Sequence, residues 1–329
     1  MSEPEKETPQ VMVSTSPHIR SGRTTRGIMM DVCLALMPAL AASLWHFGVR
    51  ALALTALSVT ACVLLEFLSR KIMKRPQTVG DWSAVVTGIL LAFNLPVTLP
   101  FWIVPIGAAV AIVVVKQMFG GIGQNFVNPA ITARIVLTVS FAGEMTKWAQ
   151  PSGAKLFWAS DAIATATPMA ALAAGKLPKE GLIEMLIGSR SGSLGETCAL
   201  ALLLGAVYLC LFRVIRPLIP AVYIGTVALF AFVAGGFNGQ LVLYELLGGG
   251  LILGACFMAT DYSTCPIHWK GKLVFALGCG LLTGLIRFYG NMPEGVSFSI
   301  LLMNLLVPLI ENITAPKAFG KERKRHAKA

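Results

Sequence analysis

Charged side chains are scarce in this sequence. Asp, Glu, Lys and Arg together make up 13% of the 329 residues, about half of the roughly 25% that is usual in soluble domains. Hydrophobic residues make up 55%, and the mean hydropathy is +0.72. This composition excludes an ordinary soluble domain and indicates that lipid surrounds most of the chain.

The sequence also lacks a cysteine framework. Its seven cysteines include no Cys-x-x-Cys pair, and most stand alone in apolar runs, where cysteine behaves as a small hydrophobe. Cys256 and Cys265 lie near His268, but this trio has no fourth ligand for a metal ion. We expect no metal site within the chain, while a ligand shared with another subunit stays open.

Acidic residues are too few to balance the basic ones, and the net charge is +11. The basic residues flank apolar segments, which is typical of topology signals beside a bilayer and not of a nucleic-acid surface. The basic tail over residues 317–328 is more typical of contact with lipid headgroups than with nucleic acid. The first 26 residues are polar and predict a flexible cytoplasmic arm without a cleavable signal.

Apolar stretches predict about ten transmembrane helices, since about 20 apolar residues cross a bilayer. Five are expected near residues 28–47, 51–69, 83–95, 100–118 and 129–143. Five more are expected near residues 195–212, 218–236, 241–260, 272–289 and 295–314. The stretch at 83–95 is short and is followed by Pro96 and Pro100, so it predicts a broken or re-entrant helix buried in protein.

The expected fold class is therefore an all-α integral membrane protein made of two five-helix halves. The expected units are a cytoplasmic arm (1–27), a first membrane half (28–143), an extracytoplasmic loop (144–194), a second membrane half (195–314) and a basic cytoplasmic tail (315–329). Because five is odd, two similar halves would be inverted repeats, as in many transporters. A faint likeness between Gly80-Asp81 and Gly195-Glu196, each before an apolar helix, agrees with this.

The basic residues also predict the orientation. With the N-terminus in the cytoplasm, the inside connections hold the cluster at residues 70–75 and Lys116, while the short outside connections hold little besides Arg50 and Arg287. This choice satisfies the positive-inside rule. Both termini are then cytoplasmic, and the loop at 144–194 lies outside the cell membrane.

Two polar segments each allow two interpretations. The glycine-rich stretch at 120–125 precedes Asn128 and Pro129, which suit a helix N-cap and first turn; it is either an anion site or a tight turn between helices. The small residues at 188–195 lead to Glu196, which we expect in the first turn of a helix. That segment either approaches a ligand phosphate or simply starts the helix.

Acidic residues at membrane depth are costly and often functional. Asp31 and Glu311 can reach the interface, but Glu66, Glu245 and Asp261 lie in or at the ends of apolar spans. We therefore take Glu66, Glu245 and Asp261 as candidates for an ion path. The sequence does not choose between Na⁺ and H⁺, and it assigns no catalytic residue.

Taken together, these segments resemble the NqrB/RnfD family, the flavin-bearing membrane subunits of respiratory redox pumps. The resemblance runs from residue 16 to residue 320 and is carried by residues 120–125, 128–130, 192–197, 257–261 and 293–297. The short polar arm and Ser16-Pro17-His18 look more like the Rnf branch of this family than like the quinone-reductase branch.

The resemblance implies a covalent flavin. In that family FMN is joined through its phosphate to a threonine in a motif close to Ser/Thr-Gly-Ala-Thr, and the matching acceptor here is Thr167. The sequence departs from the motif at Ala164 and Thr165, and Thr165 is the one competing hydroxyl nearby. Asp161 is a further neighbour of this cofactor-binding segment. The quinone-reductase relative also implies a second, noncovalent flavin.

The resemblance further implies electron transfer between ferredoxin and NAD, coupled to Na⁺ or H⁺ translocation. The chain has no iron–sulfur motif and no nicotinamide-binding fold, so partner subunits of an Rnf complex would serve ferredoxin and NAD. Two other interpretations remain: a channel or secondary transporter with inverted repeats and no redox cofactor, and a structural membrane scaffold.

Overall fold

The computed structural model describes residues 22–151, 167–173, 177, 178, 180–290 and 295–316. The regular structure of these residues is helical, which confirms the all-α prediction. Thr165 and Asp161 lie outside the described residues, so their predicted roles stay predictions.

The first half contains five longer helical segments and two short ones. They are α1 (Thr25–Phe47), α2 (Val49–Ile72), η1 (Val79–Asp81), α3 (Ser83–Phe93), α4 (Ile103–Ala109) continued by η2 (Val110–Gln117), α5 (Pro129–Ser140) and α6 (Ala142–Met145). As predicted, Asn128 caps α5: its side chain accepts hydrogen bonds from the N–H groups of Ala130 and Ile131. Helix α3 has eleven residues, of which all but Val85 are buried, as a short span inside protein requires.

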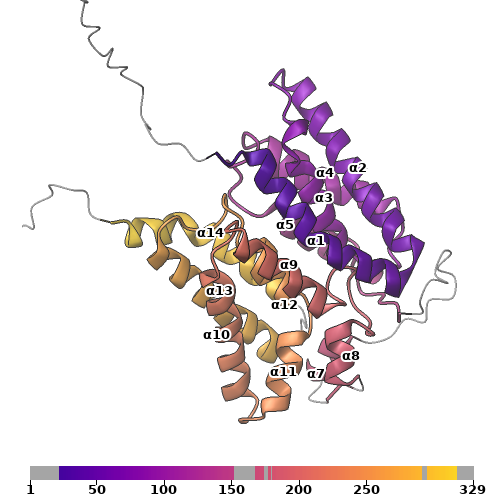
Figure 1. The fold of residues 1–329 in the computed structure, drawn as a ribbon, viewed down its shortest axis with the longest axis vertical. Helices are drawn as coiled ribbons and strands as arrows, with labels where there is room; N and C mark the ends of the chain where they lie inside the picture. The colour runs from indigo at the N-terminus through magenta and orange to yellow at the C-terminus, as the bar shows by residue number, and fades with distance from the viewer. Residues whose placement is uncertain (1–21, 152–166, 174–176, 179, 291–294, 317–329) are drawn as a thin grey trace, which may run out of the picture.

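The second half follows two small helices and contains one broken segment. The two small helices are α7 (Pro168–Ala173) and α8 (Leu182–Ile187). The second half itself consists of α9 (Ala199–Leu211), α10 (Leu218–Ala234), α11 (Gly239–Leu247), α12 (Leu251–Leu253) continued by η4 (Gly254–Met258), α13 (Trp269–Tyr289) and α14 (Val296–Thr314). Figure 1 shows the two halves side by side, with α7 and α8 beside one end of the second half.

Helices α1 and α9 pack together at the boundary between the halves, and α5 packs against α14. Within the halves, α2 packs on α3, α4 and η2, while α10 packs on α11 and α13. The close approach of α1 and α9 depends on Gly205, because a Cβ there would lie 2.1 Å from the Ala35 carbonyl oxygen. Small residues at helix contacts are typical of membrane bundles.

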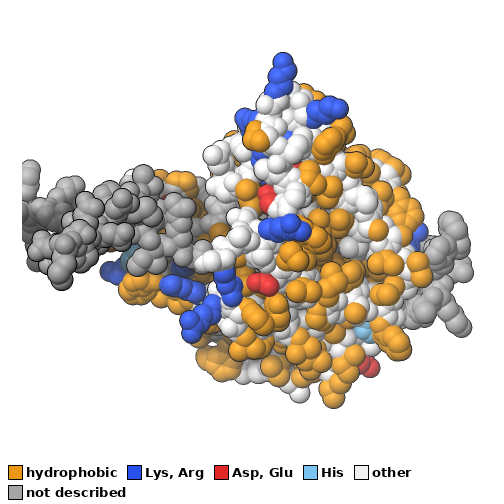
Figure 2. Space-filling view, turned by 45° about the horizontal axis from the view of Figure 1, so that its top comes forward, with side chains coloured by type: hydrophobic (Ala, Val, Ile, Leu, Met, Phe, Trp, Pro, Cys, Tyr) orange, Lys and Arg blue, Asp and Glu red, His pale blue; other side chains and the backbone are white. Residues whose placement is uncertain are grey.

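Four helices, α1, α2, α13 and α14, are long and apolar enough to cross a membrane. The pair formed by α11 and α12–η4 would make a fifth span bent by 63°. Five shorter apolar helices accompany them: α3, α4–η2, α5, α9 and α10. Hydrophobic side chains cover much of the molecular surface in Figure 2, which a soluble monomer rarely allows. The chain is a multi-pass membrane protein.

Two basic residues lie deeper than the sequence indicated. Lys116 was expected in an inside connection but belongs to η2 and is 3% exposed. Arg287 was expected in an outside connection but lies in the last turn of α13 and is 4% exposed. Each side chain has a buried carboxylate partner within the helix bundle, Glu66 for Lys116 and Glu245 for Arg287. The sides of the membrane expected for these two residues stay predictions.

Candidate functional site

The segment after Thr167 is docked on the second half of the molecule. Thr167 is 7% exposed, and its hydroxyl oxygen accepts a hydrogen bond from the Ala170 N–H at 3.2 Å. Met169 is 3% exposed and lies over the break between α11 and α12. Thr167 is therefore held close to the point where the broken span bends.

Three consecutive glycines, Gly248, Gly249 and Gly250, form that break. A Cβ at Gly248 would lie 2.4 Å from the Met169 sulfur and 2.7 Å from the Tyr244 carbonyl oxygen, so a larger residue would force the Met169 side chain and the backbone to shift. Gly249 has a φ of +60°, a conformation that favours glycine. Because these three glycines have no side chains, Met169 of α7 can pack directly on the backbone of the turn.

Buried charges converge on the same turn. Arg287 Nη1 donates to the Glu245 carboxylate at 2.9 Å and to its carbonyl oxygen at 2.8 Å, and Arg287 Nη2 donates to the Gly248 carbonyl at 3.2 Å. A buried ion pair contributes little net stability by itself, since both groups lose hydration. Its geometric effect is clearer: it holds the C-terminal end of α11 against α13.

A second buried ion pair, Arg134 with Glu196, also lies beside this turn. Arg134 on α5 lies 3.5 Å from the Glu196 carboxylate and donates to the Asn94 side chain at 2.8 Å. Arg190 donates to the Glu196 carbonyl at 2.6 Å. A Cβ at Gly250 would lie 2.6 Å from the Glu196 carboxylate, so this group also reaches the glycine turn.

The prediction for Glu196 was wrong in its local structure. Helix α9 begins at Ala199 with Cys198 as its N-cap, so Glu196 precedes the helix instead of lying in its first turn. The physical reason is that Glu196 is held by Arg134 and Arg190, both buried, while the adjoining residues form a turn against α3. The Gly195 N–H donates to the Phe93 carbonyl at 2.9 Å in that turn.

A separate polar network lies in the first half. Lys116 donates to Glu66 at 2.8 Å and to the Ser83 hydroxyl at 2.6 Å. Thr78 donates to the other Glu66 oxygen at 2.8 Å, and Asp81 accepts from Ser83. Glu66 is fully buried, so each of its two oxygens has a partner that compensates for lost water.

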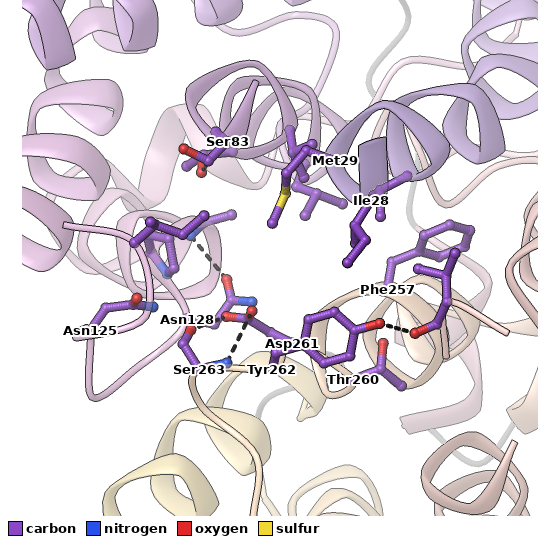
Figure 3. A pocket seen from close by; sticks show the side chains of 18 of the residues that line it. Ile28, Met29, Ser83, Asn125, Asn128, Phe257, Thr260, Asp261, Tyr262 and Ser263 are labelled. Carbon is purple, nitrogen blue, oxygen red and sulfur yellow. Dashed lines mark hydrogen bonds between the residues drawn. The ribbon is translucent and has the colours of Figure 1, made fainter. Parts of the chain in front are cut away.

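A cleft between the halves adjoins this network (Figure 3). It has a volume of about 100 Å³ and is lined by residues of both halves. The polar lining includes Lys116, Asn125, Asn128, Thr260 and Asp261, and the apolar lining includes Ile28, Met29 and Phe257. The glycine-rich turn before α5 forms part of its wall through Ile122 and Asn125.

Asp261 lies at this cleft shortly after the π-helix η4. One carboxylate oxygen accepts from the Ser263 hydroxyl at 2.9 Å and from Thr264 at 3.4 Å. Asn128 links the two halves here, donating to the Met258 carbonyl at 3.3 Å. The cleft therefore combines a carboxylate, an ammonium group, hydroxyls and amides within an apolar surround.

The three candidates for an ion path are divided between two places. Asp261 lines the cleft together with Lys116, which is the ion-pair partner of Glu66, whereas Glu245 lies at the glycine turn with Arg287.

Sequence reasoning missed Lys116, Arg134 and Arg287 as interior residues. The available signal was a single basic residue within or at the edge of an apolar run, which is costly at membrane depth. Among the described residues, no group of three His, Cys, Asp or Glu side chains is placed to hold a metal ion.

The chain is similar to known proteins over nearly its whole length. Residues 12–320 match the family described as NQR2, RnfD, RnfE. A relative from Acetobacterium woodii is 46% identical, covering 96% of this chain and 98% of the relative. That relative is named as the D subunit of a Na(+)-translocating ferredoxin:NAD(+) oxidoreductase complex.

Two further relatives carry related names. A protein from Clostridium ljungdahlii, the D subunit of a proton-translocating ferredoxin:NAD(+) oxidoreductase complex, is 41% identical over 94% of this chain and 96% of the relative. The D subunit of an ion-translocating oxidoreductase complex from Stutzerimonas stutzeri is 39% identical over 89% of this chain and 92% of the relative. The chain belongs to the NQR2, RnfD, RnfE family.

Proposed function

We propose that this chain is the D subunit of an Rnf-type ion-translocating ferredoxin:NAD oxidoreductase complex. The observation that carries the proposal is the 46% identity to such a protein over 96% of the chain. The chain is not catalytically complete alone. Ferredoxin and NAD react at partner subunits, and this chain relays electrons through the membrane.

The proposal includes FMN joined by a phosphoester to Thr167. Thr167 supplies the required hydroxyl, and its present hydrogen bond with Ala170 N–H uses the oxygen only as an acceptor. An oxygen linked to phosphorus still carries lone pairs, so the described contact is compatible with attachment. When bound, the flavin would accept and pass on electrons.

The chain's own residues would position that segment. Met169 fixes α7 on the glycine turn, and Arg287 fixes the turn by its bond to the Gly248 carbonyl. Buried side chains held by several partners keep a site rigid, which electron transfer over a fixed distance requires. The Arg134–Glu196 pair supports the same turn from α5.

We propose ten spans arranged as two inverted five-helix repeats. In support, α1 packs against α9 and α5 against α14, the first and last spans of each half. Helix α2 packs on α4–η2 as α10 packs on α13, the second and fourth spans. With both termini in the cytoplasm, Thr167 lies on the outer side, so electrons reach it across the membrane.

We propose that Asp261 and Glu66 belong to the path of Na⁺ or H⁺, with Glu245 as a further candidate on the outer side. The support is the burial of Glu66 and Glu245 within apolar helices and the cleft that the half-buried Asp261 shares with Lys116. The cleft, at about 100 Å³, is smaller than the roughly 300–1,000 Å³ typical of cofactor pockets, so we assign the second, noncovalent flavin no place in it.

The test of the covalent flavin uses the full chain expressed with its flavin transferase. Denaturing gel electrophoresis should show flavin fluorescence in the band of the parent protein and of Thr165→Ala, and none in Thr167→Ala. Thr165→Ala is the matched control, since it removes the nearest competing hydroxyl. Absence of fluorescence from the parent would refute the covalent site.

That outcome would favour the second candidate, a channel or secondary transporter without a redox cofactor. The buried ion pairs and the polar cleft suit such a protein equally. Solute or ion uptake by the isolated chain in liposomes would then be measured. Uptake by flavin-free protein would establish the transporter.

A further inference from the structure

A second cavity lies at the end of the bundle where α9 ends and α10 and α13 begin. Its volume is about 180 Å³. Two connections form its walls: the loop between α9 and α10, and the turn between η4 and α13. Three cationic side chains, Arg213, Arg216 and Lys272, line it from these walls.

The positive charge in this cavity is uncompensated. No acidic residue is among its lining residues. Within the described part of the chain, Arg213, Arg216 and Lys272 form no ion pair and no hydrogen bond through their side chains. Asp261 is on the adjoining turn, but it lines the other cleft and is held by Ser263 and Thr264. Arg213 and Arg216 are exposed and Lys272 is half-buried, and the concentration of three like charges around one cavity favours an anion there.

Arg213 occupies a position that usually belongs to glycine. Its φ is +55°, in the left-handed region, where it terminates α9 while the Val214 N–H donates to the Leu209 carbonyl. An arginine in this conformation is strained relative to glycine. Arg213 lines the cavity, and its side chain forms no hydrogen bond or ion pair within the described residues that would offset this strain.

The two walls of the cavity are joined before any ligand binds. The Tyr262 hydroxyl donates to the Val214 carbonyl, which ties the turn after η4 to the loop after α9. Thr260 and Tyr262 line both this cavity and the cleft between the halves. A ligand bound in this cavity would therefore contact Thr260 and Tyr262, which also form part of the wall of the cleft between the halves.

Exposed apolar side chains lie on both segments that bound the cavity. Leu211 and Phe212 are exposed at the end of α9, and Ile267 and Trp269 are exposed at the start of α13. In a membrane protein such side chains face acyl chains, and Trp prefers the interface. A ligand here would thus meet cations at one end and apolar surface beside it, which suits a lipid and not a free anion.

We propose that this cavity binds the phosphate of an anionic phospholipid headgroup, with Arg213, Arg216 and Lys272 as its ligands. Basic pockets between transmembrane helices are suited to such headgroups. The site is separate from the Thr167 segment and does not depend on the proposed redox function.

The experiment titrates delipidated full-length protein, in detergent, with phosphatidylglycerol or with phosphatidylcholine, and counts bound lipids by native mass spectrometry. Phosphatidylglycerol should bind in preference. Arg213→Gly should weaken this binding about fivefold, since one charge near a membrane contributes about 1 kcal/mol, and glycine suits the left-handed backbone. Arg213→Gly with Arg216→Gln should weaken it further.

Lys74→Gly is the matched control, because Lys74 also has a left-handed φ of +54°, follows a helix and lies outside the cavity. It should leave phosphatidylglycerol binding unchanged. Equal losses in Lys74→Gly and Arg213→Gly would overturn the proposal, since general surface charge would explain both. Competition by millimolar inorganic phosphate, with equal binding of both lipids, would also overturn it in favour of a free anion.

Discussion

Arg287 and Glu245 meet at 2.9 Å beside the break between α11 and α12, and the same guanidinium also donates to the Gly248 carbonyl. One side chain thus satisfies both a buried carboxylate and the C-terminal end of α11. The pair lies at the turn on which the Thr167 segment docks. Loss of the Arg287–Glu245 ion pair should therefore change the structure of the turn between α11 and α12.

Replacing Arg287 with Met should destabilise the protein by about 3–5 kcal/mol, because Glu245 is left buried without its partner. Thermal unfolding of the full chain in detergent measures this loss. The double variant Arg287→Met with Glu245→Met should recover much of it. Lys147→Met, which removes an exposed pair with Glu144, should have little effect. Equal instability of the single and double variants would contradict the prediction.

Replacing Gly248 with Ala should release the Thr167 segment, since the new Cβ would lie 2.4 Å from the Met169 sulfur. The measurement is the labelling rate of Thr167→Cys by a membrane-impermeant maleimide, in a chain otherwise free of cysteine. Labelling should rise roughly tenfold, equivalent to about 1.4 kcal/mol less protection. Gly225→Ala, where nothing lies within 4 Å of the new Cβ, is the control and should not change the rate.

Replacing Gly205 with Ala should separate α1 from α9, because the Cβ would lie 2.1 Å from the Ala35 carbonyl. Overpacking of this kind costs about 1–3 kcal/mol. Thermal unfolding should show the loss in Gly205→Ala and none in Gly225→Ala. A neutral result at Gly205 would mean that the two halves adjust their contact easily.

Asp261→Asn should lower ion translocation by the assembled complex while electron transfer from ferredoxin to NAD continues at least in part. The amide keeps acceptor capacity toward Ser263 but removes the charge from the cleft. Ion uptake by inverted membrane vesicles is the measurement. Glu311→Gln is the control, because Glu311 bonds to the Ile267 N–H away from the cleft lining. Unchanged uptake in Asp261→Asn would remove this residue from the path.

Local sequence signals predicted local features well. Asn128 before Pro129 predicted the start of α5, and the prolines after the stretch at 83–95 predicted a short buried helix. Residues that are close in the sequence determine these features, so they can be predicted from local composition and spacing.

Contacts between distant residues could not be predicted in the same way. Lys116 pairs with a residue 50 positions away, and Arg287 with one 42 positions away. No periodicity encodes such a pair, and basic residues near span ends have an alternative use as topology signals. Glu196 was placed in a helix for a similar reason: its distant partner Arg134 and its neighbour Arg190 were not visible as constraints.

The burial of Thr167 has a consequence for maturation. A hydroxyl on a residue only 7% exposed, next to a docked Met169, is out of reach of a modifying enzyme in the described conformation. Any enzyme that modifies this threonine must therefore act before α7 settles on the glycine turn, or must wait for it to lift away. If Thr167 carries the proposed flavin, the packing of Met169 on that turn therefore requires α7 to be undocked while the bond to the phosphate forms.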